Sequence, residues 1–226
     1  MTGTMMEFES NGESRRGYLA VPTSGGGPGV IVLQEWWGLV DHIKDVVDRF
    51  SAEGFVALAP DLYNGESTTS PDDAGKLMMA LDIQEVERDL RGAITGLLAR
   101  DEVTGEDVGT VGFCMGGQLS LYAACKNESV GACVVFYGIH PKVQPNLKAL
   151  QAPVLGFFAE HDEFVPPAVA RQLEADLRAV GKSADFTVFE GVDHAFFNDT
   201  RSDVYHKVHA ATCWSRILGF YREHLR

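Results

Sequence analysis

Three observations predict an α/β protein whose mostly parallel central sheet is covered by helices on both faces. Short apolar runs alternate along the chain with segments in which apolar residues recur at helical spacing. The apolar runs are continuous rather than alternating, which is typical of strands buried on both faces. No shift in composition marks a domain boundary. We therefore expect residues 1–226 to form a single domain built around such a sheet.

The N-terminal segment predicts an antiparallel hairpin at the edge of this sheet. Two short strand candidates, residues 5–9 and 16–21, flank the turn-prone pair Asn11-Gly12. Residues 23–29, Thr-Ser-Gly-Gly-Gly-Pro-Gly, then predict a flexible connector to the first buried strand.

The rest of the chain alternates between predicted strands and helices. Ser70-Pro71 followed by two aspartates is a strong helix start, and a break is expected near residues 81–82. Buried strands are predicted at residues 30–33, 55–59, 108–113, 130–136, 154–158 and 186–189. Helices are predicted at residues 40–50, 71–97, 116–125, 169–180 and 204–221. Ligands of such sheets bind beyond the carboxyl ends of the strands, so we expect the chemistry there.

Charge and cysteine content exclude several classes of function. Lys and Arg number 19 and Asp and Glu 32, which gives a net charge of −13 and makes nucleic acid and membranes poor partners. No apolar run approaches the ~20 residues that cross a bilayer, and no signal peptide is visible. A domain of this size does not need disulfides and nothing suggests export, so we expect the four cysteines to be reduced thiols in a cytoplasmic protein. They form no CxxC pair, which argues against a zinc ribbon or a redox pair.

The sharpest motif is the segment 112–117, Gly-Phe-Cys-Met-Gly-Gly, between a predicted strand and a helix of small residues. It matches the nucleophile elbow G-x-S-x-G with Cys114 in place of serine. An elbow forces its central residue into a strained turn, which small neighbours make possible. The N–H groups that begin the helix favour a thiolate, and the Met115 N–H can bind an oxyanion. The alternative is a glycine-rich turn around a buried cysteine.

Two strand ends supply an acid and a histidine in the chain order that an elbow nucleophile requires. Asp162 follows the strand predicted at 154–158, and His194 follows the one at 186–189. His194 would take the thiol proton, and Asp162 would fix its tautomer. Taken singly, each is equally well an ordinary polar loop residue.

Residues 34–38, Gln-Glu-Trp-Trp-Gly, end the first buried strand, where the second oxyanion donor of an elbow enzyme is found. We assign that donor to the Trp36 N–H. Glu35 is expected to hold the resting Cys114 thiol, or else to be a solvated carboxylate at the strand end. Trp36 and Trp37 either wall a substrate pocket or pack in the core.

Several motifs together resemble the dienelactone hydrolase family of α/β-hydrolases over nearly the whole chain. The segments that carry the resemblance are 34–35, 59–63, 112–117, 136–138, 162–166 and 191–196. Cysteine at the elbow combined with the Gln-Glu strand end is the most specific feature. The resemblance implies the α/β-hydrolase fold and a Cys-His-Asp triad formed by Cys114, His194 and Asp162, with Glu35 as the auxiliary carboxylate.

The family's carboxylate clamp is not evident in this sequence. The resemblance implies two arginines that hold a substrate carboxylate, but Asn198 and Pro71 occupy those positions, and Gly75 occupies that of a binding tyrosine. We therefore expect a preference for neutral substrates, and nothing in the sequence places Arg201 in the pocket. The expected pocket residues are Trp37, Tyr137, Phe196 and Asn198, of which Tyr137 is equally suited to packing beside the sheet.

The function expected from the sequence is hydrolysis of a small ester or lactone through a cysteine acyl-enzyme, without a cofactor or metal. The expected partner is the small-molecule substrate, and the expected assembly a monomer or homodimer. Two alternatives remain open at this point. One is an acyltransferase that uses the same thioester, and the other is a non-catalytic binding or sensor protein with a hydrolase fold.

Overall fold

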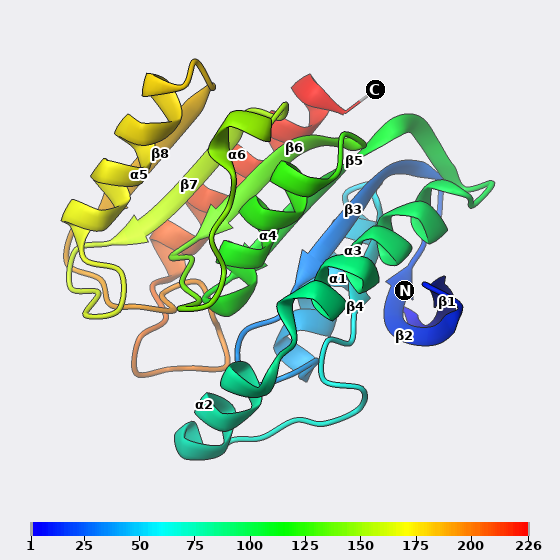
Figure 1. Cartoon of the computed structure of the whole chain (residues 1–226), viewed down its shortest axis with the longest axis horizontal. Coiled ribbons are helices and arrows are strands. Elements are labelled where there is room, and N and C mark those ends of the chain that lie inside the picture. Colours follow the sequence, from blue (N-terminus) through cyan, green and yellow to red (C-terminus); the bar gives the residue numbers. More distant parts are fainter. Residues whose placement is uncertain (1, 226) are drawn as a thin grey trace.

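The computed structural model describes residues 2–225, which form an eight-stranded sheet with the order β1-β2-β4-β3-β5-β6-β7-β8 (Figure 1). The pairs β1–β2 and β2–β4 are antiparallel, and all other neighbours are parallel. The strands are β1 (Thr4–Ser10), β2 (Glu13–Ala20), β3 (Gly27–Leu33), β4 (Val56–Pro60), β5 (Val103–Phe113), β6 (Val130–Phe136), β7 (Val154–Ala159) and β8 (Ala184–Phe189). The predicted fold class is confirmed, including the hairpin at the sheet edge.

Helices cover both faces of the sheet and divide the core in two. The helices are α1 (Asp41–Ala52), α2 (Pro71–Ala80), α3 (Ile83–Leu98), α4 (Met115–Lys126), α5 (Pro167–Ala179) and α6 (Lys207–His224), with a short 3₁₀ turn at Leu147–Ala149. Apolar residues of α1 and α6 pack on one face, and those of α3, α4 and α5 on the other. In Figure 1, α4 lies in front of the sheet and α6 behind it. No helix among residues 2–225 is long and apolar enough to cross a bilayer.

The structure corrects the predicted connector, because its last three residues already belong to β3. A Cβ atom on Gly27 would lie 1.9 Å from the Gly54 carbonyl oxygen, so the glycine serves a close backbone approach rather than flexibility. The Gly-Pro-Gly sequence hid this part of the strand.

Helix boundaries follow local capping. The break expected near residues 81–82 is confirmed, since Asp82 Oδ1 accepts hydrogen bonds from the N–H groups of Gln84 and Glu85 and caps α3. The C-terminal helix begins at Lys207 rather than at Val204, because the His206 side chain accepts from the His209 N–H and caps it. This change leaves Val204 on the loop that follows β8.

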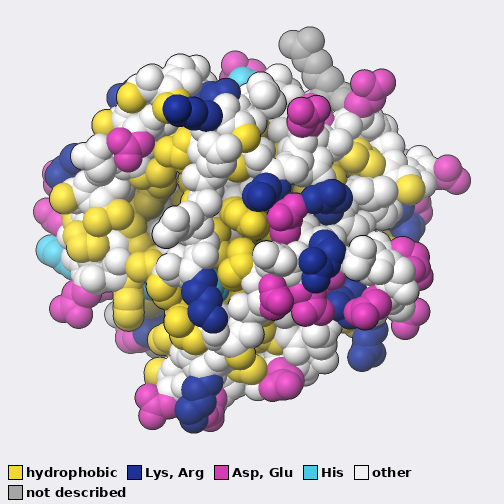
Figure 2. Space-filling view, viewed as in Figure 1, with side chains coloured by type: hydrophobic (Ala, Val, Ile, Leu, Met, Phe, Trp, Pro, Cys, Tyr) yellow, Lys and Arg dark blue, Asp and Glu magenta, His cyan; other side chains and the backbone are white. Residues whose placement is uncertain are grey.

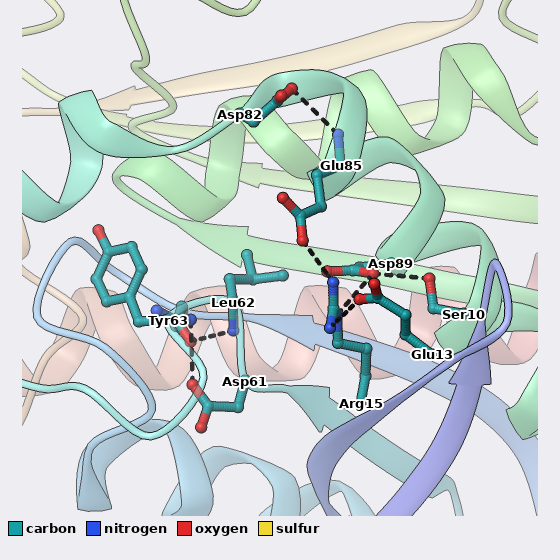
Figure 3. A network of polar contacts seen from close by, with 10 residues as sticks. Ser10, Glu13, Arg15, Asp61, Leu62, Tyr63, Asp82, Glu85 and Asp89 are labelled. Carbon is teal, nitrogen blue, oxygen red and sulfur yellow. Dashed lines mark hydrogen bonds and ion pairs between the residues drawn. The ribbon is translucent and has the colours of Figure 1, made fainter.

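A polar network ties the N-terminal hairpin to α3 (Figure 3). The Arg15 guanidinium on β2 contacts Asp89 at 3.0 Å, Glu85 at 2.5 Å and Glu13 at 2.8 Å. Ser10 on β1 also donates to Asp89. In Figure 2, acidic and basic side chains lie beside one another over this region of the surface. The hairpin is thereby fixed at the sheet edge, far along the sheet order from β7 and β8.

Candidate active site

Cys114 lies at the sharp turn between β5 and α4, with φ 53° and ψ −118°. That backbone conformation is strained for any residue with a side chain. It is possible here because glycines stand two residues before and two residues after Cys114. A Cβ atom on Gly112 would lie 1.9 Å from the Gly116 oxygen, and a Cβ atom on Gly116 would lie 2.4 Å from the Leu33 oxygen. The segment therefore forms the elbow that the sequence predicts. The next residue, Met115, begins α4, so its N–H is one of the helix's free donors.

The loops after β7 and β8 bring Asp162 and His194 together. Asp162 Oδ2 lies 2.7 Å from His194 Nδ1, and Asp162 Oδ1 accepts hydrogen bonds from the N–H groups of Phe164 and Val165. The Asp162 side chain is fully buried, whereas that of His194 keeps about a sixth of its surface exposed, at 16%. The loop itself therefore fixes the carboxylate, and the carboxylate orients the imidazole.

The charges around His194 favour its protonated form. Burial lowers the pKa of His194, but the hydrogen bond to Asp162 and the nearby Asp162 and Cys114 side chains outweigh burial and raise that pKa to about 10. His194 Nε2 is buried and makes no hydrogen bond to any of residues 2–225. An imidazolium next to Cys114 is the arrangement that activates a thiol.

The other three cysteines have no such neighbour. Cys125, Cys133 and Cys213 are buried, and all four cysteines are free thiols. Burial raises the pKa of Cys133 to about 11 and that of Cys125 to about 12, and it raises the pKa of Cys213 as well. These three thiols are therefore protonated at neutral pH, as expected of core residues.

Glu35 follows the end of β3 and is almost completely buried, at 1% exposure. Its Oε2 accepts a hydrogen bond of 2.7 Å from Asn198 Nδ2, whereas its Oε1 has no partner among residues 2–225. Gln34, the preceding residue, accepts a hydrogen bond from the Leu62 N–H and so ties the strand end to the segment after β4. A buried carboxylate with one oxygen that accepts no hydrogen bond is unusual, which indicates a functional role for that oxygen.

A cavity of about 460 Å³ joins these groups. Trp36, Trp37 and Phe164 form an aromatic wall, with ring centroids 5.0 Å apart for the two tryptophans and 6.5 Å for Trp36 and Phe164. The Phe164 ring also lies 5.1 Å from that of His194. The lining consists of Glu35, Trp36, Trp37, Met78, Cys114, Ile139, Pro141, His161, Glu163, Phe164, Asp193, His194, Ala195, Arg201 and Val204.

The structure places Arg201 in the cavity wall, which the sequence did not indicate. Its guanidinium makes two hydrogen bonds to the Asp203 carboxylate, at 3.0 and 2.6 Å. Hydrogen bonding to Asp203 raises the pKa of Arg201, and the Glu35 carboxylate adds to the effect. A cation is therefore present, but its own neighbour neutralises it, while Glu163 and Asp193 add negative charge to the lining.

Three residues expected in the pocket lie behind its wall. Tyr137 is fully buried with φ 37° and its ring 4.7 Å from that of His194, and Phe196 packs in the core against Phe136 and Phe189. Asn198 is buried against Glu35 and does not reach the cavity surface. Of the other predicted site residues, five line the cavity: Glu35, Trp36, Trp37, Cys114 and His194. Met115 and Asp162 are buried and are not part of the lining.

Among residues 2–225, no three His, Cys, Asp or Glu side chains are grouped so that they would hold a metal ion. The polar groups of the cavity nearest the elbow are the Cys114 thiol, the His194 imidazole, which Asp162 binds from outside the lining, and the Glu35 carboxylate.

Comparison with known proteins identifies the family. The model of the dienelactone hydrolase family matches residues 15–225. The chain belongs to the dienelactone hydrolase family. It is therefore an ester or lactone hydrolase with the α/β-hydrolase fold.

Two relatives of this dienelactone hydrolase family member match it over nearly their whole length. The chain is 39% identical to protein usf of Aquifex pyrophilus, with 99% of each chain covered. It is 38% identical to a putative carboxymethylenebutenolidase of Aquifex aeolicus, and the alignment covers 99% of this chain and 100% of the relative. The crystal structure of a putative dienelactone hydrolase from Klebsiella pneumoniae superposes with a TM-score of 0.87 at 29% identity, over 99% of this chain and 100% of that one.

Proposed function

We propose that this protein hydrolyses small, neutral esters or lactones through an acyl-enzyme on Cys114. One observation carries the proposal: Cys114 stands at a strained elbow in the wall of a cavity, beside a histidine that Asp162 orients and keeps protonated. Cysteine and histidine side chains that meet in this way form the standard machinery of nucleophilic acyl transfer.

The proposed reaction begins with attack of the Cys114 thiolate on the substrate carbonyl carbon. A C–S bond forms, and the carbonyl electron pair moves to oxygen, where the N–H groups of Met115 and Trp36 bind the oxyanion. When the oxyanion collapses, the C–O bond to the leaving group breaks and the His194 imidazolium gives its proton to the departing oxygen. In a lactone this oxygen stays attached to the acyl group, so the whole substrate remains on the enzyme as a thioester.

His194 is neutral after this step and serves as the base for the second half of the reaction. It accepts a proton from water, whose oxygen attacks the thioester carbon, and the thiolate is expelled as the new carboxylic acid leaves. The cycle restores the thiolate and the imidazolium. Asp162 keeps Nδ1 protonated throughout, so that Nε2 faces Cys114 and the cavity.

The proposed substrate class follows from the lining of the cavity. A volume of about 460 Å³ suits a small molecule, and three aromatic rings offer it apolar surface. The charged groups of the lining leave an excess of carboxylates once Arg201 is paired with Asp203. The Aquifex aeolicus relative is named a putative carboxymethylenebutenolidase, a lactone-opening activity that we extend here to neutral lactones. A thiolate is easily expelled from a tetrahedral adduct, so activated leaving groups such as enols are favoured.

A screen of lactones and esters against the wild-type protein and Cys114→Ala tests the proposal. We expect turnover of at least one neutral enol-lactone or p-nitrophenyl ester by the wild type and none by the variant. Substantial activity of Cys114→Ala would show that the nucleophile is wrong. Added alcohols or amines test the transferase alternative, since ester or amide products would then exceed the acid. One burst per protein without turnover would favour the sensor alternative.

A further inference from the structure

The loop after β8 fixes the side chain of Asn198 in one orientation. Asn198 Oδ1 accepts hydrogen bonds from the Thr200 N–H at 3.0 Å and from the Thr200 hydroxyl at 2.7 Å. A backbone N–H can only donate, so the atom that faces Thr200 must be the amide oxygen. The NH₂ group consequently points the other way, toward Glu35, whose Oε2 lies 2.7 Å from Asn198 Nδ2.

Two further contacts hold the loop after β8 in place, independently of the contact between Asn198 and Glu35. Asp199, which lies between Asn198 and Thr200, contacts Nδ1 of His42 on α1 at 3.1 Å, and His42 is buried. The N–H of Arg201 donates to the Asn198 carbonyl oxygen and closes the turn. Asn198 is therefore anchored by its backbone and its side chain before it meets Glu35, and it does not simply follow the position of the glutamate.

The two oxygens of Glu35 are consequently unequal. Oε2 is bound by an amide that carries no charge, and Oε1 is buried and bare in a side chain that lines the cavity with Cys114 and His194. We propose that Asn198 is a positioning residue that locks the Glu35 carboxylate so that its free oxygen serves the Cys114 side of the cavity. This inference rests on the proposed function, in which Cys114 is the nucleophile.

A neutral donor suits this task better than a cation or a second acid. A cation would neutralise Glu35, whereas an amide stabilises the carboxylate by one hydrogen bond and leaves its charge in place. An aspartate of the same shape would set two carboxyl groups 2.7 Å apart, and such a pair is stable only while it shares a proton. The Asn198→Asp variant would therefore make the state of Glu35 depend on pH.

Other ionisable groups near Glu35 also affect the pH dependence of both rates, and they are the same in all variants. They are Tyr137 behind the cavity and the ionisable side chains of its lining, Cys114, His161, Glu163, Asp193, His194 and Arg201. None of them is altered, so a difference between variants at a given pH arises from the substitution itself and from its effect on their titration.

The experiment measures two quantities between pH 5.5 and 9 for the wild type, Asn198→Asp and the matched control Asn11→Asp, which lies in the exposed turn between β1 and β2. One is kcat/KM for a p-nitrophenyl ester, and the other is the rate at which iodoacetamide labels Cys114. For Asn198→Asp we expect both to approach the wild type near pH 5.5 and to depart from it by roughly tenfold or more above pH 8. Asn11→Asp should follow the wild type throughout.

Thr200→Val provides a milder second variant, because it removes the hydroxyl donor to Asn198 Oδ1 but keeps the backbone N–H. It should change both rates in a pH-independent way and by less than Asn198→Asp. If folded Asn198→Asp, judged by its circular dichroism and thermal melt, shows the wild-type pH profile in both measurements, Asn198 does not position Glu35. A pH-independent loss would assign it a merely structural role and also overturn the proposal. Absence of ester turnover by the wild type would instead contradict the proposed function, and the labelling rates would still test Asn198.

Discussion

The pairing of Asp162 with His194 makes Asp162→Asn the most informative change in the proposed triad. The N–H groups of Phe164 and Val165 bind Asp162 Oδ1 and would keep the amide oxygen of the asparagine in that place. Its NH₂ group would then face His194 Nδ1. Two donors cannot face each other, so the neutral imidazole would adopt the tautomer with its proton on Nε2. The nitrogen that should accept the proton of the thiol or of water would already carry one.

The size of the effect follows from the same contact. The rise of the His194 pKa from 6.5 to about 10 corresponds to ~5 kcal/mol, because one unit is ~1.4 kcal/mol, and Asp162 shares this stabilisation with Cys114. Asp162→Asn removes the contribution of Asp162 to this stabilisation and places the His194 proton on Nε2. The two effects together should lower kcat by about 10³ to 10⁴, which is ~4 to ~5.5 kcal/mol in activation free energy. The assay is the steady-state release of p-nitrophenol from an acetate or butyrate ester near pH 7.5.

Asp176→Asn is the matched control, since it makes the same change of charge on the exposed surface of α5. It should leave kcat within about twofold of the wild type. If folded Asp162→Asn kept more than a tenth of the wild-type kcat, the carboxylate would not set the tautomer of His194, and the assignment of the acid would be wrong.

Three further predictions concern the nucleophile, the elbow and the charge of the substrate. Iodoacetamide should label Cys114 at least tenfold faster than the other three thiols, all of which burial keeps protonated; equal labelling, read by peptide mass, would refute this. Gly112→Ala should prevent folding or destabilise the protein by more than ~3 kcal/mol in urea, because its Cβ would lie 1.9 Å from the Gly116 oxygen. The kcat/KM of a lactone that carries a methyl ester should exceed that of the same lactone with a free carboxylic acid. Asp203→Asn should lower this ratio of kcat/KM values by roughly tenfold, because it releases the Arg201 guanidinium to bind the acid. A preference of the wild-type protein for the free acid would show that Arg201 already binds carboxylates.

The layered part of the fold was predictable from the sequence because burial on both faces leaves a strong local signal. Runs such as residues 30–33 are apolar throughout and alternate with segments of helical spacing, and the helix start at Ser70 was recognisable from its cap. The first half of β5 gave no such signal. Residues 103–107 include charged and exposed side chains, and they join the sheet only through the start of β3, on the far side of a register shift.

The candidate site was predictable where chemistry is tied to strand ends. Cys114, Asp162 and His194 each follow a parallel strand, so the sheet order alone brings them to one edge. Side chains on long loops gave no comparable signal. Phe164 and Arg201 line the cavity because their loops fold back over the sheet, and that path depends on tertiary contacts that no local pattern records. The Asn198–Glu35 contact spans 163 residues and was hidden for the same reason.

The central claim, a covalent acyl-enzyme on Cys114, is tested most directly by mass spectrometry during turnover. The protein is mixed with an excess of a p-nitrophenyl ester, quenched in acid within the first turnovers, and analysed intact and after digestion. We predict one added acyl group per chain, located on the peptide that contains Cys114 and absent from Cys114→Ala. Steady turnover by the wild type without any adduct, or with an adduct on another residue, would contradict the account.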